Sequence, residues 1–287
     1  MTLSMAWVRR VGVAHELVFA SDSRLTGGRR WDACPKILTL PRSDALIAFA
    51  GDTLDAYPLM IQFRNWVELD SRARDRERDI TEIKKRMRRM FADMHTHISD
   101  LPRGVDKAPP FDCELLFGGW SWLRSEFCIW RFAWNADDTS YNFSGMRSQL
   151  LKGQRWPIMF AGTPDAVEDA RTRLADRLEI KNGPRAHILN MEPFEILRDV
   201  IRAETYSDVG GPPQLAKVYR NGRSQPFAVR WATPAAELSV LGRPLFHRER
   251  IAVPIVDPDA VEFRTEKTLA KRARRALVGV DKGVSAT

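Results

Sequence analysis

The stretch that decides the fold runs from Thr2 to Gly51 and reads TLSMAWVRRVGVAHELVFASDSRLTGGRRWDACPKILTLPRSDALIAFAG. Apolar and β-branched residues form four short runs separated by turn-forming residues, which predicts two successive β-hairpins. The first turn is expected near Arg10–Glu16 and the second at Pro41–Asp44. The four predicted strands are residues 2–8, 17–22, 36–40 and 45–50.

These hairpins determine which residues lie side by side. An antiparallel hairpin brings the start of one strand beside the end of its partner. Thr2 should therefore lie beside Asp22, and Lys36 beside Gly51. If the two hairpins are neighbours in one sheet, a hydroxyl, a carboxylate, an ammonium and a flexible backbone N–H meet at one rim.

The position of Thr2 gives this cluster a chemical meaning. Initiator Met is usually removed when a small residue follows it, and removal would leave Thr2 with a free α-amine and a β-hydroxyl. An N-terminal Thr uses its own amine as the base that activates its hydroxyl. The ordinary pKa of an α-amine, about 7.7–8.0, suits a general base near neutral pH.

The other residues of the cluster support the same chemistry. A nearby Lys36 ammonium would lower the pKa of the amine and stabilise negative charge on the attacking oxygen. Asp22 would hold the Lys36 side chain in place. Gly51, which lacks a Cβ, would let a substrate carbonyl approach its backbone N–H, as an oxyanion hole requires.

In order and rough spacing, Thr2, Asp22-Ser-Arg24, Lys36 and Gly51 resemble the N-terminal signature of proteasome β-type subunits, which are N-terminal-nucleophile (Ntn) hydrolases. Within that superfamily the chain is most similar to the bacterial branch, the ancestral β-subunit (Anbu) and HslV-like group. Residues 205–213, TYSDVGGPP, are similar to the late Gly-Pro-Pro loop of that group.

The resemblance covers roughly residues 2–232 and implies an α/β (α+β) fold, a four-layer αββα sandwich with two mainly antiparallel sheets. It implies Thr2, Asp22 and Lys36 as catalytic residues and Gly51 as the oxyanion donor. The family's mid-chain Ser falls near residues 161–163, where Thr163 supplies the only hydroxyl. The residues implied in supporting roles are Ser23, Arg24, Thr163 and Asp208.

The rest of the chain alternates between predicted strands and paired helices. Asp52 is a candidate N-cap of the first helix, and Asp79 with Glu82 resembles a capping box that opens the second. Leu54 and Ile61 are expected on the buried stripe of the first helix. The predicted helices are 53–70, a second from 79, one opening at 162–164, and 191–204; the predicted strands are 113–120, 127–134, 157–161, 215–220 and 227–231.

Composition limits the function classes. The 287 residues are 44% hydrophobic, enough for a sizeable core, and carry a net charge of +8. Three cysteines show neither metal-like spacing nor a disulfide framework, and no apolar run approaches the roughly 20 residues that span a bilayer. Without an evident signal peptide, we expect a cytoplasmic protein. His95 and His97 do not share a helix face, so neither a metal nor a cofactor is expected.

Basic residues concentrate in Arg72–Arg89 and Lys267–Arg275. Solvated helix faces and a tail explain them better than nucleic-acid binding, which is the least favoured interpretation. The expected domains are a hydrolase domain over 1–232, a C-terminal extension or arm over 233–263, and a basic tail, disordered or helical, over 264–287.

Two functions remain open from the sequence. One is a peptidase that cleaves peptide or protein substrates with Thr2 as nucleophile. The other is a catalytically silent assembly or binding subunit that keeps the same fold. For either, the resemblance implies a homo-oligomeric ring or spiral, an ATP-dependent unfoldase as a candidate partner, and no membrane association.

Overall fold

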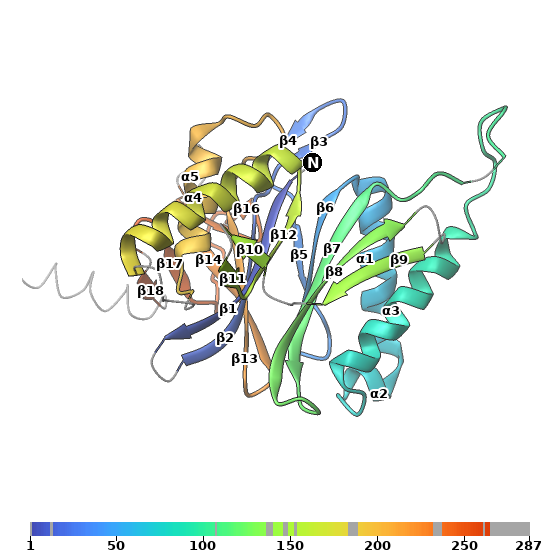
Figure 1. Ribbon diagram of the computed structural model, residues 1–287, viewed down its shortest axis with the longest axis horizontal. Helices are drawn as coiled ribbons and strands as arrows, with labels where there is room; N and C mark the ends of the chain where they lie inside the picture. Colours follow the sequence, from blue (N-terminus) through green and yellow to red (C-terminus); the bar gives the residue numbers. More distant parts are fainter. Residues whose placement is uncertain are drawn as a thin grey trace, which may run out of the picture.

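Two antiparallel sheets dominate the computed structural model of the protein (Figure 1). The chain is a mixed α+β protein; among the pairs of strands that the structure describes, β14 and β17 are parallel and the others are antiparallel. The basic tail predicted from residue 264 lies almost entirely outside the described residues. Those residues are 2–11, 14–106, 108–135, 140–145, 149–151, 154–182, 189–231, 237–260 and 262–264.

The larger sheet has nine strands in the order β12-β1-β2-β13-β14-β15-β16, with β17 pairing β14 and β18 pairing β17. The region expected to be an extension or arm therefore adds strands to the edge at β14. The strand bounds are β1 Leu3–Val11, β2 Ala14–Ser21, β12 Ile158–Gly162, β13 Gln214–Tyr219, β14 Arg223–Arg230, β15 Leu238–Val240, β16 Arg243–Pro244, β17 Ile255–Asp257 and β18 Glu262–Arg264.

The second sheet has five strands in the order β5-β6-β7-β8-β9, and the predicted hairpin over residues 113–134 is confirmed within it. Its strands are β5 Ile37–Thr39, β6 Ala45–Gly51, β7 Cys113–Ser121, β8 Glu126–Asn135 and β9 Ser140–Gly145. Two small ribbons complete the strands: β3 Leu25–Thr26 with β4 Arg30–Trp31, and β10 Gln149–Leu151 with β11 Gln154–Trp156.

The expectation that the first two hairpins are neighbours in one sheet is wrong. The β1–β2 hairpin belongs to the nine-stranded sheet, whereas β5–β6 belongs to the five-stranded sheet. The two sheets instead pack face to face, because both hairpins carry apolar side chains on both faces. The shared core includes Ala6, Phe19, Leu46, Ala48 and Leu116.

The first hairpin is also longer than predicted. Val11 pairs with Ala14, and Arg9 pairs with Glu16, so both strands extend into the segment expected to turn. The Arg9 guanidinium lies 2.6 Å from the Glu16 carboxylate. This cross-strand ion pair allows charged residues to continue the ladder where the sequence suggested a loop.

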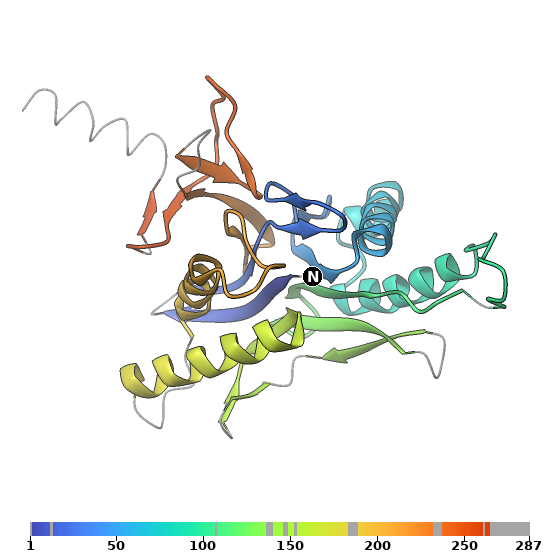
Figure 2. The same ribbon diagram turned by 90° about the horizontal axis from the view of Figure 1, so that it is seen from above.

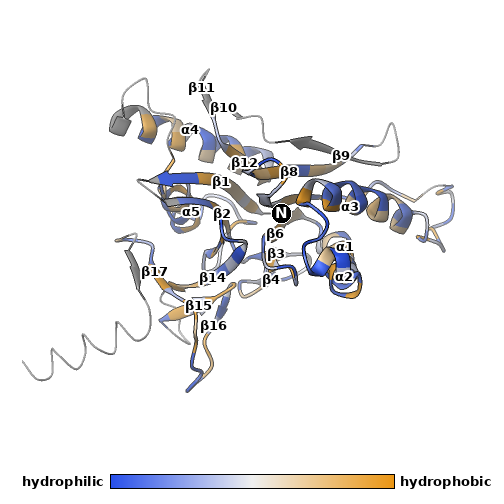
Figure 3. Ribbon diagram, turned by 90° about the horizontal axis from the view of Figure 1, so that it is seen from below, coloured by the Kyte–Doolittle hydropathy of each residue, from blue (hydrophilic) through white to orange (hydrophobic). Residues whose placement is uncertain are grey.

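Helices cover the outer faces of the two sheets (Figures 1 and 2). Phe63 of α1 and Phe91 of α3 pack in one core with Phe117 of β7, and Phe194 of α5 packs in another with Trp7 of β1. The helices are α1 Thr53–Leu69, α2 Ser71–Arg74, α3 Ile80–His95, α4 Pro164–Asn182 and α5 Glu192–Ala203. Figure 3 shows apolar and polar residues alternating along α3 and α4, as one-sided burial requires.

The N-caps predicted for α1 and α3 are confirmed, whereas two residues predicted on the buried face of α1 are exposed. Asp52 and Asp79 are N-caps, accepting hydrogen bonds from the N–H groups of Leu54 and Thr81 respectively. Leu54 and Ile61, expected in the core, are exposed by 82% and 50%. The buried residues of α1 are instead Ala56, Leu59, Met60, Phe63 and Val67. Within the described ranges, no helix is long and apolar enough to cross a membrane.

Candidate functional site

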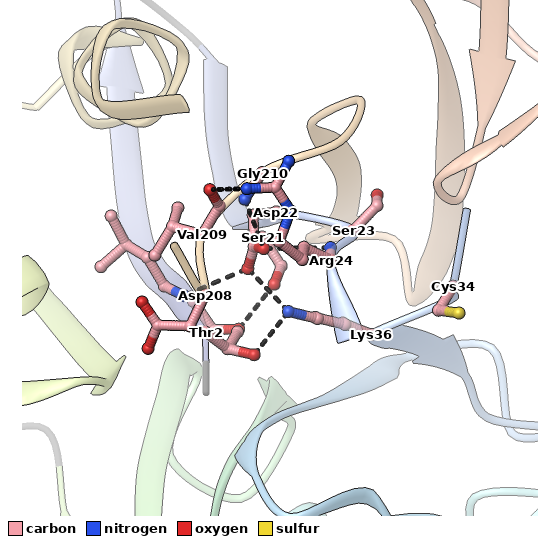
Figure 4. Close-up of polar contacts among 12 residues, drawn as sticks. Thr2, Ser21, Asp22, Ser23, Arg24, Cys34, Lys36, Asp208, Val209 and Gly210 are labelled. Carbon is pink, nitrogen blue, oxygen red and sulfur yellow. Dashed lines mark hydrogen bonds and ion pairs between the residues drawn. The ribbon is translucent and has the colours of Figure 1, made fainter. Parts of the chain in front are cut away.

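Thr2 lies immediately before β1, where the open ends of the two sheets face each other. Its hydroxyl oxygen accepts a hydrogen bond from Lys36 Nζ at 2.5 Å (Figure 4). Its carbonyl accepts one from the Thr163 N–H at 3.0 Å. The residue is fully buried in the chain that carries Met1. In that chain the Thr2 nitrogen belongs to a peptide bond, so a free α-amine requires removal of Met1.

Asp22 directly follows β2 and uses both carboxylate oxygens. Oδ1 accepts from Lys36 Nζ at 2.9 Å and from the Leu3 N–H at 3.1 Å. Oδ2 accepts from the N–H groups of Arg24 and Gly210 at 3.1 and 3.0 Å. Three backbone donors and one ammonium therefore fix the position of this buried carboxylate.

Lys36 connects the two sheets through the hydrogen bonds and ion pair of its ammonium group. It precedes β5 in the smaller sheet, and its Nζ reaches Asp22 and Thr2 at the larger one. The Phe49 N–H donates to the Lys36 carbonyl at 3.2 Å, so Lys36 lies opposite Phe49 and not opposite Gly51 as predicted. Burial lowers the pKa of the Lys36 ammonium, and the Asp22 carboxylate opposes that shift. The ion pair is completely removed from solvent.

The register of β6 directs the Gly51 N–H toward the site. In an antiparallel ladder, successive residues direct their N–H groups to opposite sides. The Asp52 N–H donates to the carbonyl of Asp112, which lies on the β7 side of β6. The Phe49 N–H donates to the carbonyl of Lys36, which lies on the β5 side. Gly51, two residues after Phe49, therefore directs its N–H to the side where Lys36 lies.

Glycine is required at position 51 for a reason the sequence did not reveal. Its φ is +105°, a conformation that other residues rarely adopt. A Cβ there would lie 2.4 Å from the Asp112 carbonyl oxygen and 2.7 Å from Cys113 Cα. The close approach of the chain entering β7, in addition to substrate access, excludes any side chain.

Thr163 and Asp208 meet beside Thr2. The Thr163 hydroxyl donates to the Asp208 carboxylate, and the Thr163 N–H donates to the Thr2 carbonyl. Ala161, the other position considered for the mid-chain hydroxyl, lies in β12 and pairs with Ser4. Two supporting residues expected from the resemblance are thus brought to the site from segments 45 residues apart.

Ser23 and Arg24 hold the loop that carries Asp208. The Ser23 hydroxyl donates to the Pro212 carbonyl at 2.5 Å. The Arg24 guanidinium donates to the Val209 carbonyl at 3.2 Å and forms two bonds to Asp32, at 2.7 and 2.9 Å. These hydrogen bonds lower the pKa of Asp32. Ser23 and Arg24 therefore act structurally on the site and do not face its reacting atoms.

Gln214, at the start of β13, is a site residue that sequence reasoning missed. Its Oε1 accepts from the N–H groups of Lys36 and Ile37, at 3.0 and 3.3 Å. Its Nε2 donates to the carbonyls of Asp22 and Cys34, at 3.1 and 2.8 Å. A fully buried amide thus joins the segments that carry the ion pair. The available signal was a polar residue at the first position of a predominantly buried strand that directly follows the Gly-Pro-Pro turn.

A pocket of about 370 Å³ adjoins this cluster. It lies where β6 and β8 end and β7 begins, near the junction of β12 and α4. Gly162 connects it to the nucleophile, because a Cβ on Gly162 would lie 2.0 Å from the Thr2 carbonyl oxygen. The lining residues are Ala50, Gly51, Phe111, Asp112, Cys113, Glu114, Ala133, Trp134, Gly162 and Pro164.

In the part of the chain that the structure describes, no group of three or more His, Cys, Asp or Glu side chains is placed to hold a metal ion. No protein-family model matches the chain, and no curated protein matches it in a sequence search.

Proposed function

We propose that the protein is an Ntn hydrolase of proteasome type that cleaves peptide bonds with Thr2 after removal of Met1. The observation that carries the proposal is the buried bridge in which Lys36 Nζ donates to both Thr2 Oγ1 and Asp22 Oδ1. A purely structural ion pair would not require contact with the hydroxyl of residue 2. A hydroxyl that acts as a nucleophile does require a neighbouring group that activates it, and Lys36 is placed to do so.

The mechanism follows from these contacts. The free amine of Thr2 takes the proton from Oγ1, which attacks the substrate carbonyl. The Lys36 ammonium stabilises the negative charge on Oγ1, and the Gly51 N–H stabilises the oxyanion. The amine then returns the proton to the leaving nitrogen, and the C–N bond breaks. Water, activated by the same amine, hydrolyses the ester and restores Thr2.

Thr163 and Asp208 support an active enzyme over a silent subunit. Their hydrogen bond lies beside the Thr2 backbone, where a free amine would emerge. A carboxylate and a hydroxyl at that point are suited to orient an amine and to balance its charge. A subunit used only for assembly has no need of this arrangement at its N-terminus.

The arrangement of sheets and helices is compatible with the same proposal. Two sheets packed face to face, with helices on both outer faces, support a four-layer αββα sandwich of Ntn type. Peptide or protein substrates, a homo-oligomeric ring or spiral, and an ATP-dependent unfoldase are parts of the proposal that follow from the resemblance alone.

Hydrolysis of internally quenched peptides by Thr2 variants tests the function. Thr2→Ala keeps the processing signal for Met1 removal and loses the hydroxyl, so it should abolish turnover. Thr2→Ser keeps both groups and should retain measurable activity. The matched control is Thr26→Ala on the exposed β3–β4 ribbon, which should leave turnover unchanged. A wild-type chain without Met1 that cleaves no peptide would favour the silent subunit.

A further inference from the structure

The pocket beside Thr2 lies on the leaving-group side of the proposed reaction, and this deduction rests on the proposed function. The amine that protonates the leaving nitrogen belongs to the Thr2 backbone. The leaving half of the substrate must therefore lie against that backbone. Gly162 and Pro164 line the pocket and flank Thr163, whose N–H bonds to the Thr2 carbonyl.

The pocket is built to take a single side chain and not an extended surface. Its volume of about 370 Å³ falls near the lower end of the range for ligand pockets, roughly 300–1,000 Å³. Gly51 and Gly162 bring bare backbone to two of its walls. Trp134 supplies an aromatic wall, and contacts to His95 and Phe111, with ring centroids 4.3 and 5.3 Å away, hold the indole in place.

The charge of the pocket is negative. Asp112 and Glu114 line it, and no Lys or Arg is among its described lining residues. The Glu114 carboxylate is neutralised by Arg131 of β8, with one bond at 3.0 Å. The Asp112 carboxylate is therefore the negatively charged group of the pocket that a substrate could pair with. The Asp112 N–H donates to the Asp55 carboxylate at 2.8 Å.

Two further carboxylates, Asp52 and Asp55 at the start of α1, lie close to Asp112 but do not line the pocket. Burial raises the pKa of Asp55, and the carboxylates of Asp52 and Asp112 add to that shift. Asp112 is therefore the acidic side chain of this group that a substrate in the pocket would meet. An anionic or purely apolar substrate side chain would be repelled or poorly matched there.

We propose that this pocket selects substrates with Lys or Arg immediately after the cleaved peptide bond. The cationic head would pair with the Asp112 carboxylate, and its methylene stem would lie along Trp134. Specificity then resides on the leaving-group side, with Asp112 as the residue that determines it. The selection itself is non-covalent, and it makes or breaks no bond of the substrate or the protein.

The test uses internally quenched peptides that differ only in the residue after the cleaved bond, which is Arg, Lys, Leu or Glu. The cleavage position is verified by mass spectrometry, and kcat/KM is measured for each. Wild type should prefer Arg and Lys over Glu by about tenfold or more. Asp112→Asn should reduce the preference for Arg over Leu by about threefold to fivefold. Asp112→Lys should reverse the order and favour Glu.

Asp112 is exposed and its backbone bonds survive substitution, so these variants should fold. Asp75→Asn, an exposed carboxylate on the loop after α2, is the matched control and should leave the preference unchanged. In parallel, an electrophile with residues only on the acyl side is used to label Thr2.

Two failures are distinguishable. Labelling of Thr2 together with equal cleavage of the Arg and Glu peptides, or with an unaltered preference in Asp112→Asn, would overturn the specificity and leave the hydrolase intact. Absence of both labelling and cleavage would overturn the specificity together with the proposed function.

Discussion

The buried pair of Lys36 and Asp22 makes the sharpest prediction about stability and activity together. The perturbation is Lys36→Met, which keeps the length of the side chain and removes its charge and its donors. The partner change is Asp22→Asn, and the two are combined in a double-mutant cycle. Both side chains are completely buried, so solvent cannot replace the lost partner.

The structure sets the magnitude of each loss. Removing one partner of a buried ion pair costs about 3–5 kcal/mol, because the remaining charge is left unpaired. After Lys36→Met, Asp22 still accepts three backbone N–H bonds, so the expected loss is at the lower end, about 3 kcal/mol. After Asp22→Asn the ammonium keeps fewer partners, and we expect about 4 kcal/mol.

Urea unfolding monitored by tryptophan fluorescence measures these free energies, and peptide hydrolysis measures the catalytic loss. The double variant should be less destabilised than the sum of the single variants by about 2 kcal/mol, within the range of contacting pairs. Loss of the Lys36 donor should lower kcat by about a hundredfold to a thousandfold. Additive free energies, or a Lys36→Met variant with wild-type kcat, would refute the reasoning.

Three further predictions concern the residues around the pair. Gln214→Met leaves buried backbone donors and acceptors unpaired, so it should lower the free energy of unfolding by about 2–3 kcal/mol. It should also lower kcat more than it changes KM, and a kcat equal to that of the wild type would contradict a positioning role. Hydrogen bonds from Arg24 hold the pKa of Asp32 below its ordinary 3.8, so the stability they contribute is present above that pH and is lost as pH falls through the folded-state pKa. The urea midpoint of the wild type should fall as the pH is lowered through this range, and the fall should be smaller in Asp32→Asn. An equal fall in both proteins would contradict this prediction. Gly210→Ala should destabilise by about 1–3 kcal/mol because its Cβ would lie 2.2 Å from the Arg24 guanidinium carbon, whereas Gly27→Ala, with no atom within 4 Å of its Cβ, should not.

Local patterns predicted much of the secondary structure. Alternation and turn residues are short-range signals, and they placed the second and third hairpins and the N-caps at Asp52 and Asp79 within a residue or two, although the first hairpin is longer than predicted. The buried face of α1 was predicted less well, since Leu54 and Ile61 are apolar yet exposed. Apolar character shows that a residue is able to be buried, but the neighbouring element decides whether it is.

The meeting of the two hairpins could not be read from local pattern. Apolar runs such as residues 45–50 are buried on both faces, and the sequence does not say whether a strand's neighbour lies beside it or across from it. The sequence predicted correctly that Lys36 lies near Asp22, but it did so by assuming that both hairpins belong to one sheet, which is wrong. The contact across two sheets depends on a register that only long-range packing sets.

Gln214 and Asp112 were missed for a related reason. Neither belongs to a motif, and each acquires its role from segments distant in the sequence, such as Cys34 for Gln214 and Asp55 for Asp112. Buried amides and pocket carboxylates become visible only when hydrogen bonds and cavities are known. Thr163 was named as a site residue from the family resemblance, and the Gly-Thr-Pro sequence predicted only the start of the helix that follows it, α4.

The central claim is that residue 2 carries both the attacking oxygen and the base. It is tested most directly by the intact mass of the purified protein, measured before and after treatment with an electrophile that captures N-terminal Thr. We predict a mass that lacks Met1 and a single adduct, located by peptide mapping on the fragment that begins with Thr2. A protein that retains Met1, or one that lacks Met1 and carries no adduct under conditions that label a control threonine protease, would contradict the claim.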